Sequence, residues 1–259
     1  MQTILGANGV IGRALSRELS AYTDRIRQVS RTPTRVDPTD DLCSADLLDA
    51  KATADAVAGS SVAYLVAGLK YDYRVWQEQW PTVMRNAIDG CKRHGSALVF
   101  FDNVYAYGRV EGVMTEETPY NPCSRKGEVR ARIATKWVGN PNAIHTFTYT
   151  PDAGRTVALL GNSVTAYGQV WHALTSHEPM TGEDYVRMAC ELSGRPYGLQ
   201  VPPRWMLSLL GAFVPALREN MEMLYQLEHD YRFDSTKIKR AFGLTATAYR
   251  EGISATVRD

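Results

Sequence analysis

Three glycines near the start of the chain constrain its fold more than any other feature. Gly6, Gly9 and Gly12 have the spacing G-x-x-G-x-x-G and directly follow a short apolar run. The residues after them have helical periodicity, and one face is predicted to hold Val10, Ala14, Leu15 and Leu19. A strand, a tight glycine turn and a helix in this order are typical of the start of an α/β domain.

The N-terminal part continues to alternate short strands with helices. We predict strands at 26–30, 61–68 and 97–102, and helices at 49–59 and 73–93. This alternation implies right-handed crossovers and a parallel sheet that helices cover on both faces. The predicted fold class is therefore α/β, a Rossmann-like doubly wound parallel sheet.

The C-terminal part follows a different pattern. Strands are predicted at 145–150 and 168–174, and helices at 124–137, 152–161 and 181–194, the last with Thr181 as its N-cap. The segments 202–217 and 219–231 are rich in Met, Leu and aromatic residues. We interpret them as helices of a small, mostly helical lobe rather than as a cofactor site.

Each glycine of the motif has a physical role in binding a dinucleotide. Gly6 permits the tight turn, Gly9 lets backbone N–H groups approach a pyrophosphate, and Gly12 lets the helix pack closely. The helix N-terminus adds unpaired N–H groups and the positive end of a dipole. We therefore favour dinucleotide binding over a purely structural turn. The cofactor residues predicted in the motif are Gly6, Asn8, Gly9, Val10, Ile11 and Gly12.

The end of the second strand bears on the choice between NAD and NADP. An acidic side chain there would accept hydrogen bonds from the ribose 2′-hydroxyl, but Ser30 and Arg31 occupy these positions. Because an arginine can form a bidentate pair with a 2′-phosphate, Arg31 with Arg35 favours NADP, with NAD as the alternative.

Two further segments complete the predicted cofactor site. Asp46 and Leu47 lie where a third strand should end, and Asp46 either binds the adenine amino group or caps the next helix. The end of the segment 61–68 contributes Val66, Ala67 and Gly68.

Five stretches carry a resemblance to a known family. GANGVIG, ADLLDA, YLVAG, FFDNVYAYG and the tail FDSTKIKRAFGLTATAYREGISATV resemble an extended-type short-chain dehydrogenase/reductase of the NAD(P)-dependent epimerase/dehydratase superfamily. The chain is most similar to the atypical subgroups, whose active-site residues vary. The resemblance implies one Rossmann-like domain over residues 1–259, in which about residues 165–235 form a small substrate lobe.

The family's active site is a Ser after the fourth strand and a Tyr-x-x-x-Lys pair on the next helix. Asn103 stands at the position of the Ser, and aligning PCSRKGEVR places Lys126 at the Tyr and Arg130 at the Lys. An Asn amide can still donate a hydrogen bond to a substrate oxygen. The pair becomes Lys-x-x-x-Arg, and this departure puts the family's proton chemistry in doubt.

The replacement residues have limited chemical options. Arg130 stays charged and shuttles no proton, although it can bind ribose hydroxyls or a phosphate. Lys126, which would also contact the cofactor, becomes an acid/base only if burial or a nearby positive charge lowers its pKa. The alternative is that both are solvated helix residues. Tyr105 and Tyr120 are substitute acids or packing aromatics, and Tyr107 matches the family's structural Tyr.

The chain is also short after this helix. Family members usually carry a strand and a long substrate loop there, but several tens of residues are missing near Thr135–Lys136. Either the protein is shortened or the printed sequence lacks a segment. We favour the second, because loss of a central strand would cut through the sheet.

Composition narrows the classes of partner. The formal net charge of +1 predicts no broad attraction to nucleic acid or to anionic membranes, and the apolar runs are too short to span a bilayer. The four cysteines are widely spread and read as reduced thiols, with no metal site. No signal peptide is visible at the N-terminus. We therefore expect a cytoplasmic protein, and the resemblance implies a homodimer.

Three functions are weighed. The first is an NADP-dependent oxidoreductase or epimerase/dehydratase acting on a small molecule, either a sugar nucleotide or another carbonyl or hydroxyl compound. The second is a catalytically inactive dinucleotide-binding sensor, since the glycine loop is intact while the Tyr-x-x-x-Lys pair is not. The third, a purely structural protein, leaves the glycine loop without a reason.

Overall fold

The computed structural model describes residues 1–70, 72–119, 121, 139–199, 201 and 224–258. The chain divides into two compact units. The first unit comprises Met1–Lys70, Arg74–Asp102 and Thr150–Gln169, and the second comprises Tyr71–Tyr73, Asn103–Tyr149 and Val170–Asp259. The predicted substrate lobe, about residues 165–235, falls mostly in the second unit.

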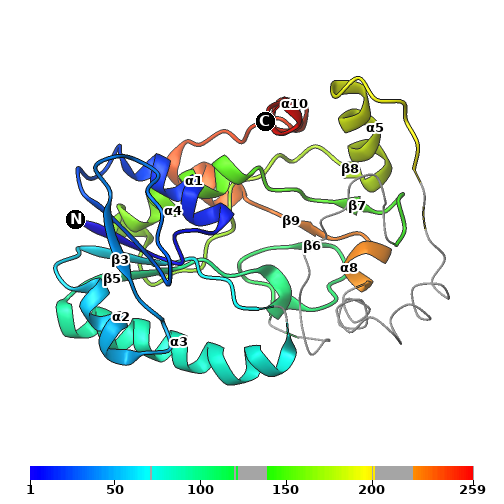
Figure 1. The fold of residues 1–259 in the computed structure, drawn as a ribbon. Coiled ribbons are helices and arrows are strands. Elements are labelled where there is room, and N and C mark those ends of the chain that lie inside the picture. Colours follow the sequence, from blue (N-terminus) through cyan, green and yellow to red (C-terminus); the bar gives the residue numbers. More distant parts are fainter. Residues whose placement is uncertain (71, 120, 122–138, 200, 202–223, 259) are drawn as a thin grey trace. The chain divides into compact units, whose positions relative to one another are not determined.

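The first unit is built on a five-stranded parallel sheet of order β3-β2-β1-β4-β5 (Figure 1). Its strands are β1 (Gln2–Leu5), β2 (Ile26–Ser30), β3 (Asp41–Ser44), β4 (Val62–Leu65) and β5 (Ala97–Phe100). The chain moves outward from β1 in one direction to β3 and then in the other direction through β4 to β5. The predicted Rossmann-like parallel sheet is confirmed.

Helices cover both faces of this sheet. On one face α1 (Val10–Leu19) and α4 (Thr150–Gly161) pack together over side chains such as Ile4 and Tyr64. On the other, α2 (Ala50–Val57) and α3 (Tyr73–His94) cover Leu5 and Leu65. The inner strand β4 is covered on both faces, and it is wholly buried and wholly apolar, whereas the edge strand β3 alternates between half-buried and exposed residues.

Two strands predicted near the C-terminal half differ from the structure. The prediction at 145–150 was too long, because β7 covers only Ile144–His145 and Thr150 already begins α4. The prediction at 168–174 was wrong. No strand is present in this segment, and the N–H of His172 donates to Glu116 Oε1 at 3.0 Å instead of to a neighbouring strand.

The second unit contains two small sheets. β6 (Val113–Met114) pairs in parallel with β9 (Arg232–Phe233), and β7 pairs antiparallel with β8 (Met180–Thr181). Its described helices are α5 (Gly182–Leu192), α8 (Tyr225–Glu228), α9 (Thr236–Phe242) and α10 (Tyr249–Arg258), with a 3₁₀ turn at Val104–Tyr107. The short 3₁₀ turn Val164–Ala166 belongs to the first unit.

The predicted start of α5 is confirmed. The Thr181 hydroxyl accepts from the backbone N–H of Asp184, whose carboxylate accepts from the backbone N–H of Thr181, which completes a capping box. The helices predicted at 124–137 and 202–217 lie outside the described residues. Of the segment 219–231 the structure describes α8 and its flanks.

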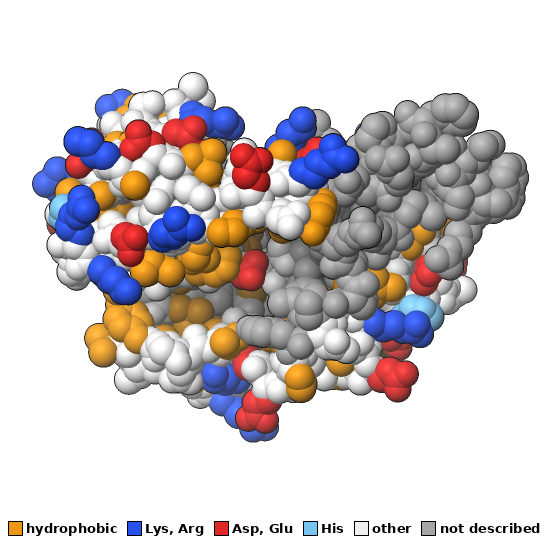
Figure 2. Space-filling model, turned by 90° about the horizontal axis from the view of Figure 1, so that it is seen from below, with side chains coloured by type: hydrophobic (Ala, Val, Ile, Leu, Met, Phe, Trp, Pro, Cys, Tyr) orange, Lys and Arg blue, Asp and Glu red, His pale blue; other side chains and the backbone are white. Residues whose placement is uncertain are grey.

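Charged side chains of both signs are interspersed over the coloured part of the face in Figure 2. This mixture agrees with the small net charge of the chain. None of the described helices has the length and apolar character needed to cross a membrane.

Candidate functional site

The carboxyl ends of the strands bring the predicted cofactor residues to one edge of the sheet. The register aligns Leu5 with both Val29 and Leu65, and Ser30 with Ser44. The segments that follow β1, β2, β3 and β4 therefore leave the sheet side by side, all within the first unit. The strand order reverses between β1 and β4, and ligands of open α/β sheets bind at such a reversal.

Two glycines of the motif are required by the protein's own structure. Gly6 has φ +94°, and a Cβ there would lie 2.4 Å from Ala67 Cα. A Cβ on Gly12 would lie 2.6 Å from the carbonyl oxygen of Ala7. A larger residue at either position would collide with backbone, so these two glycines let the turn close on itself and on the segment after β4.

Gly9 has no such requirement. Its φ of −69° and ψ of 161° suit any residue, and the nearest atom to an added Cβ is Gly6 O at 3.4 Å, an ordinary contact. A side chain at this position would instead occupy space outside the turn. The glycine therefore leaves room for something other than the chain's own atoms.

The first turn of α1 presents free donors. The backbone N–H groups of Val10, Ile11 and Gly12 make no hydrogen bond with any residue that the structure describes. Val10 is 61% exposed, so its predicted place on the buried face was wrong, and Ile11 faces the core with Leu15 and Leu19 instead. Such N–H groups at a helix start are suited to phosphate oxygens.

Asn8 contacts the segment after β2. Its amide Nδ2 donates to Thr32 O at 2.7 Å, and its Oδ1 accepts from the backbone N–H and the hydroxyl of Thr34, both at 3.2 Å. Sequence reasoning assigned Asn8 to the cofactor, and the structure shows its side chain holding a neighbouring loop.

The segment that directly follows β2 carries two arginines. Arg31 and Arg35 are exposed, and their side chains form no ion pair or hydrogen bond with the described part of the chain. The hydroxyl of Ser30 is covered and likewise has no partner among the described residues. Sequence reasoning missed Arg13, whose guanidinium donates to Thr34 Oγ1 at 3.1 Å. Its position just after Gly12 was the available signal.

The segment after β3 resolves one alternative. The N-cap of α2 is Asp49, which accepts from Ala52 N at 2.9 Å, so the proposal that Asp46 caps this helix was wrong. Asp46 is exposed and accepts from Leu48 N at 3.0 Å. The carbonyl of Leu47 accepts from Nδ2 of the buried Asn86 at 2.9 Å, a contact that sequence reasoning did not find.

The segment after β4 lies against the glycine turn. β4 ends at Leu65, earlier than predicted, so Val66, Ala67 and Gly68 form the loop that follows it. Val66 is buried and its N–H donates to Leu5 O at 3.0 Å, whereas a Cβ on Gly68 would meet no described residue within 4 Å apart from its chain neighbours.

The predicted catalytic residues are described only in part. Asn103 is exposed and belongs to the second unit, directly before the 3₁₀ turn that contains Tyr105. The other predicted residues, Tyr120, Lys126 and Arg130, lie outside the described residues, as does the region near Thr135–Lys136.

Tyr107 has a structural environment. Its side chain is 4% exposed, and His172 Nδ1 lies 2.7 Å from Asp234 O. Since a carbonyl only accepts, Nδ1 donates, and Nε2 of the same ring accepts from the Tyr107 hydroxyl at 3.0 Å. This buried pair agrees with the family's structural Tyr.

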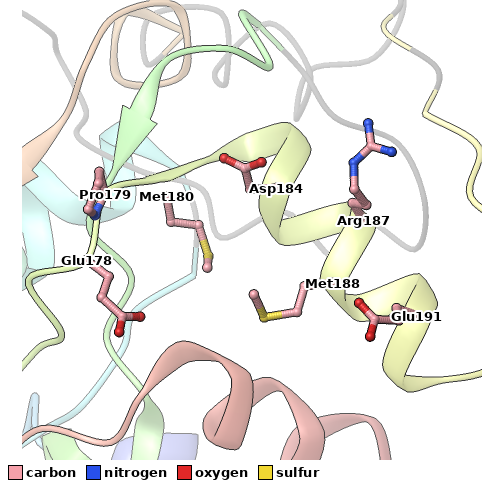
Figure 3. Close-up of a pocket in the computed structure, with 7 residues that line it drawn as sticks. All are labelled: Glu178, Pro179, Met180, Asp184, Arg187, Met188 and Glu191. Carbon is pink, nitrogen blue, oxygen red and sulfur yellow. The ribbon is translucent and has the colours of Figure 1, made fainter.

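A cavity of about 420 Å³ in the second unit is lined by Glu178, Pro179, Met180, Asp184, Arg187, Met188 and Glu191 (Figure 3). Three of its four charged side chains, all but Glu178, already have local partners: Asp184 caps α5, Arg187 pairs with Glu183 at 2.6 Å, and Glu191 pairs with Arg250 at 2.7 Å. The cavity therefore offers no set of free catalytic groups.

A second cavity of about 500 Å³ in the same unit is lined by His145, His177, Arg232 and Asp234, among others. Burial lowers the pKa of His145 to about 4, with Asp230 opposing the shift. His145 is thus neutral at physiological pH. In the described part of the chain, no group of three or more His, Cys, Asp or Glu side chains is placed to hold a metal ion.

The fold is of the Rossmann-like class, and this sheet edge carries a glycine turn of the kind that suits a dinucleotide. The model of the NAD dependent epimerase/dehydratase family matches residues 3–129. The matched stretch carries the glycine motif, covers just under half of the chain, and agrees with the sequence resemblance. Curated protein sequences give no match.

Several solved structures share the fold over nearly the whole chain. MoeE5 in complex with UDP-glucuronic acid and NAD has a TM-score of 0.74 at 18% identity, covering 99% of this chain and 97% of that one. UDP-glucuronic acid 4-epimerase from Bacillus cereus in complex with NAD has a TM-score of 0.73 at 16% identity, covering 100% and 96%. Triphenylmethane reductase from Citrobacter sp. complexed with NADP(H) has 0.71 at 13%, covering 98% and 99%.

Proposed function

We propose that the chain binds NADP(H) at the carboxyl edge of its parallel sheet and acts as an oxidoreductase or epimerase/dehydratase. The observation that carries the proposal is Gly9, whose backbone conformation does not require glycine and where an added Cβ makes only an ordinary contact, with Gly6 O at 3.4 Å. A glycine without a structural reason, beside three unpaired N–H groups, is what close approach of a pyrophosphate needs. The matching family is described as NAD dependent.

The residues at this edge fit the phosphorylated cofactor. Arg31 and Arg35 are exposed and unengaged in the described chain, and no carboxylate stands at the end of β2 to bind a ribose 2′-hydroxyl. The structural neighbours named above bind either NAD or NADP(H). The preference for NADP therefore rests on this chain's own arginines.

When bound, the nicotinamide would supply hydride transfer. A side chain of the protein would have to donate or accept the accompanying proton. We propose that Asn103 orients a substrate oxygen, that Lys126 or Tyr105 acts as general acid/base, and that Arg130 holds a ribose hydroxyl or phosphate. The substrate is a small carbonyl or hydroxyl compound, and a sugar nucleotide fits because two of the neighbours bind or convert UDP-sugars. The cytoplasmic location and homodimer stay predictions.

The test is a fluorescence titration of the purified protein with NADPH and NADH. We expect tighter NADPH binding that Arg31→Asp reverses. We expect Gly9→Val to abolish binding of both while circular dichroism and the melting temperature stay unchanged, since the added Cβ makes only an ordinary contact, with Gly6 O at 3.4 Å. Normal binding by Gly9→Val would refute the assignment of the glycine turn.

Two assays on the purified protein distinguish an enzyme from a sensor. One sequence observation favours the sensor: the chain has Lys-x-x-x-Arg where the family has Tyr-x-x-x-Lys, although its glycine motif is intact. Oxidation of NADPH with any carbonyl compound of a substrate panel would support the enzyme. Tight binding without turnover, together with a partner protein retained in the presence of NADPH, would support the sensor.

A further inference from the structure

The loop between β2 and β3 is held at two places. Near its end, the buried Asp40 carboxylate accepts from Val36 N at 2.8 Å and Asp37 N at 2.9 Å. The same oxygen accepts from Gln28 Nε2 at 2.8 Å, and Gln28 is wholly buried in β2. This end of the loop is thus anchored on the sheet.

The other end is anchored on the glycine turn. Asn8 makes three hydrogen bonds to Thr32 and Thr34, and Arg13 makes one more to Thr34 Oγ1. No other side chain that the structure describes bonds to residues 32–34. A side chain from the middle of the glycine motif therefore fixes a loop about 25 residues away in sequence.

Arg31 and Arg35 lie on either side of the residues that Asn8 holds. Arg35 also stands directly before Val36, which Asp40 holds, and the carbonyl of Arg31 accepts from Ser44 Oγ at 2.8 Å. The backbone of both arginines is thus fixed while their guanidinium groups stay exposed. Fixing the backbone lowers the entropy that binding must remove.

We propose that Asn8 is a positioning residue that sets the preference for NADPH over NADH. It holds the 32–34 segment so that Arg31 and Arg35 are ready for a 2′-phosphate, and its side-chain amide is engaged by Thr32 and Thr34. Arg13 supports the same loop and adds a third positive charge near it. The inference rests on the proposed NADP(H) binding at this edge.

The experiment measures dissociation constants for NADPH and NADH by fluorescence in wild type and Asn8→Ala. We expect Asn8→Ala to weaken NADPH by about ten-fold, the equivalent of ~1.4 kcal/mol, and to change NADH by less than about two-fold. The reason is that NADH has no phosphate for the arginines to bind. A residue with only a structural role would weaken both cofactors alike.

Two further variants make the result specific. Thr39→Val is the matched control, because Thr39 lies in the same loop but its hydroxyl bonds to Asp37 Oδ1 at 2.7 Å and to no other described residue. The ratio of its NADPH and NADH dissociation constants should equal that of wild type. In an Arg31→Ala/Arg35→Ala background, Asn8→Ala should no longer affect NADPH.

The outcomes separate the two proposals. A wild type that prefers NADPH, with an unchanged ratio in Asn8→Ala, would overturn the role of Asn8 alone. An undiminished effect of Asn8→Ala in the double-arginine background would overturn it as well, because Asn8 would then act without the arginines. A wild type that binds neither cofactor would overturn the proposed function and this inference with it.

Discussion

Lowering the pH should destabilise the protein through His145. This side chain is 6% exposed, and burial lowers its pKa to about 4 from the usual 6.5. The unfolded chain therefore binds a proton between these two pKa values while the folded chain does not. Stability from this residue is fully present above the unfolded pKa and falls as pH drops toward the folded pKa.

The difference between the folded and unfolded pKa values of His145 sets how much unfolding free energy is lost on lowering the pH. Each unit of difference corresponds to ~1.4 kcal/mol, and between about pH 7.5 and about pH 5 the loss integrates to about 2 kcal/mol. Urea unfolding at the two pH values measures it. Carboxylates also titrate near the lower pH, so the quantity of interest is the difference between wild type and His145→Gln.

We expect His145→Gln to remove about 2 kcal/mol of the pH dependence, whatever it does to stability at neutral pH. His94→Gln is the control, because His94 is exposed at the end of α3. If His145→Gln keeps the full pH dependence of wild type, or if His94→Gln loses as much of it, the reasoning from burial is refuted.

Two other predictions concern the core and catalysis. Tyr64→Phe should lower the free energy of unfolding, measured in urea, by about 1–3 kcal/mol. The reason is that the buried hydroxyl donates to Gln2 Oε1 at 2.7 Å and accepts from Asn162 Nδ2 at 3.0 Å. Tyr22→Phe, at a 43% exposed residue, should lower it little, and an equal loss in both variants would contradict the prediction. Lys126→Ala should lower any NADPH-dependent turnover more than Lys136→Ala does; equal effects would return Lys126 to the class of surface residues.

The sequence alone predicted the parallel sheet, and it located the edge at which we propose that the cofactor binds. Apolar runs, helical periodicity and the spacing of Gly6, Gly9 and Gly12 are local signals, and the structure confirms the strands and helices of the first unit that they predicted. Caps are local as well, and the prediction of Thr181 was right. The prediction that Asp46 caps α2 was wrong because Asp49, three residues later, is the N-cap. Both residues are aspartates, so N-cap propensity alone does not choose between them.

Tertiary structure decided which residue does what at the site. The pattern G-x-x-G-x-x-G does not distinguish its three glycines. In the folded chain Ala67 lies against Gly6 and Ala7 against Gly12, so these two glycines are required by the fold and Gly9 is not. Asn8 reaches Thr32 and Thr34 because β1 and β2 are neighbours in the sheet. Such contacts depend on strand order and register, which join residues far apart in the chain, and no local pattern encodes them.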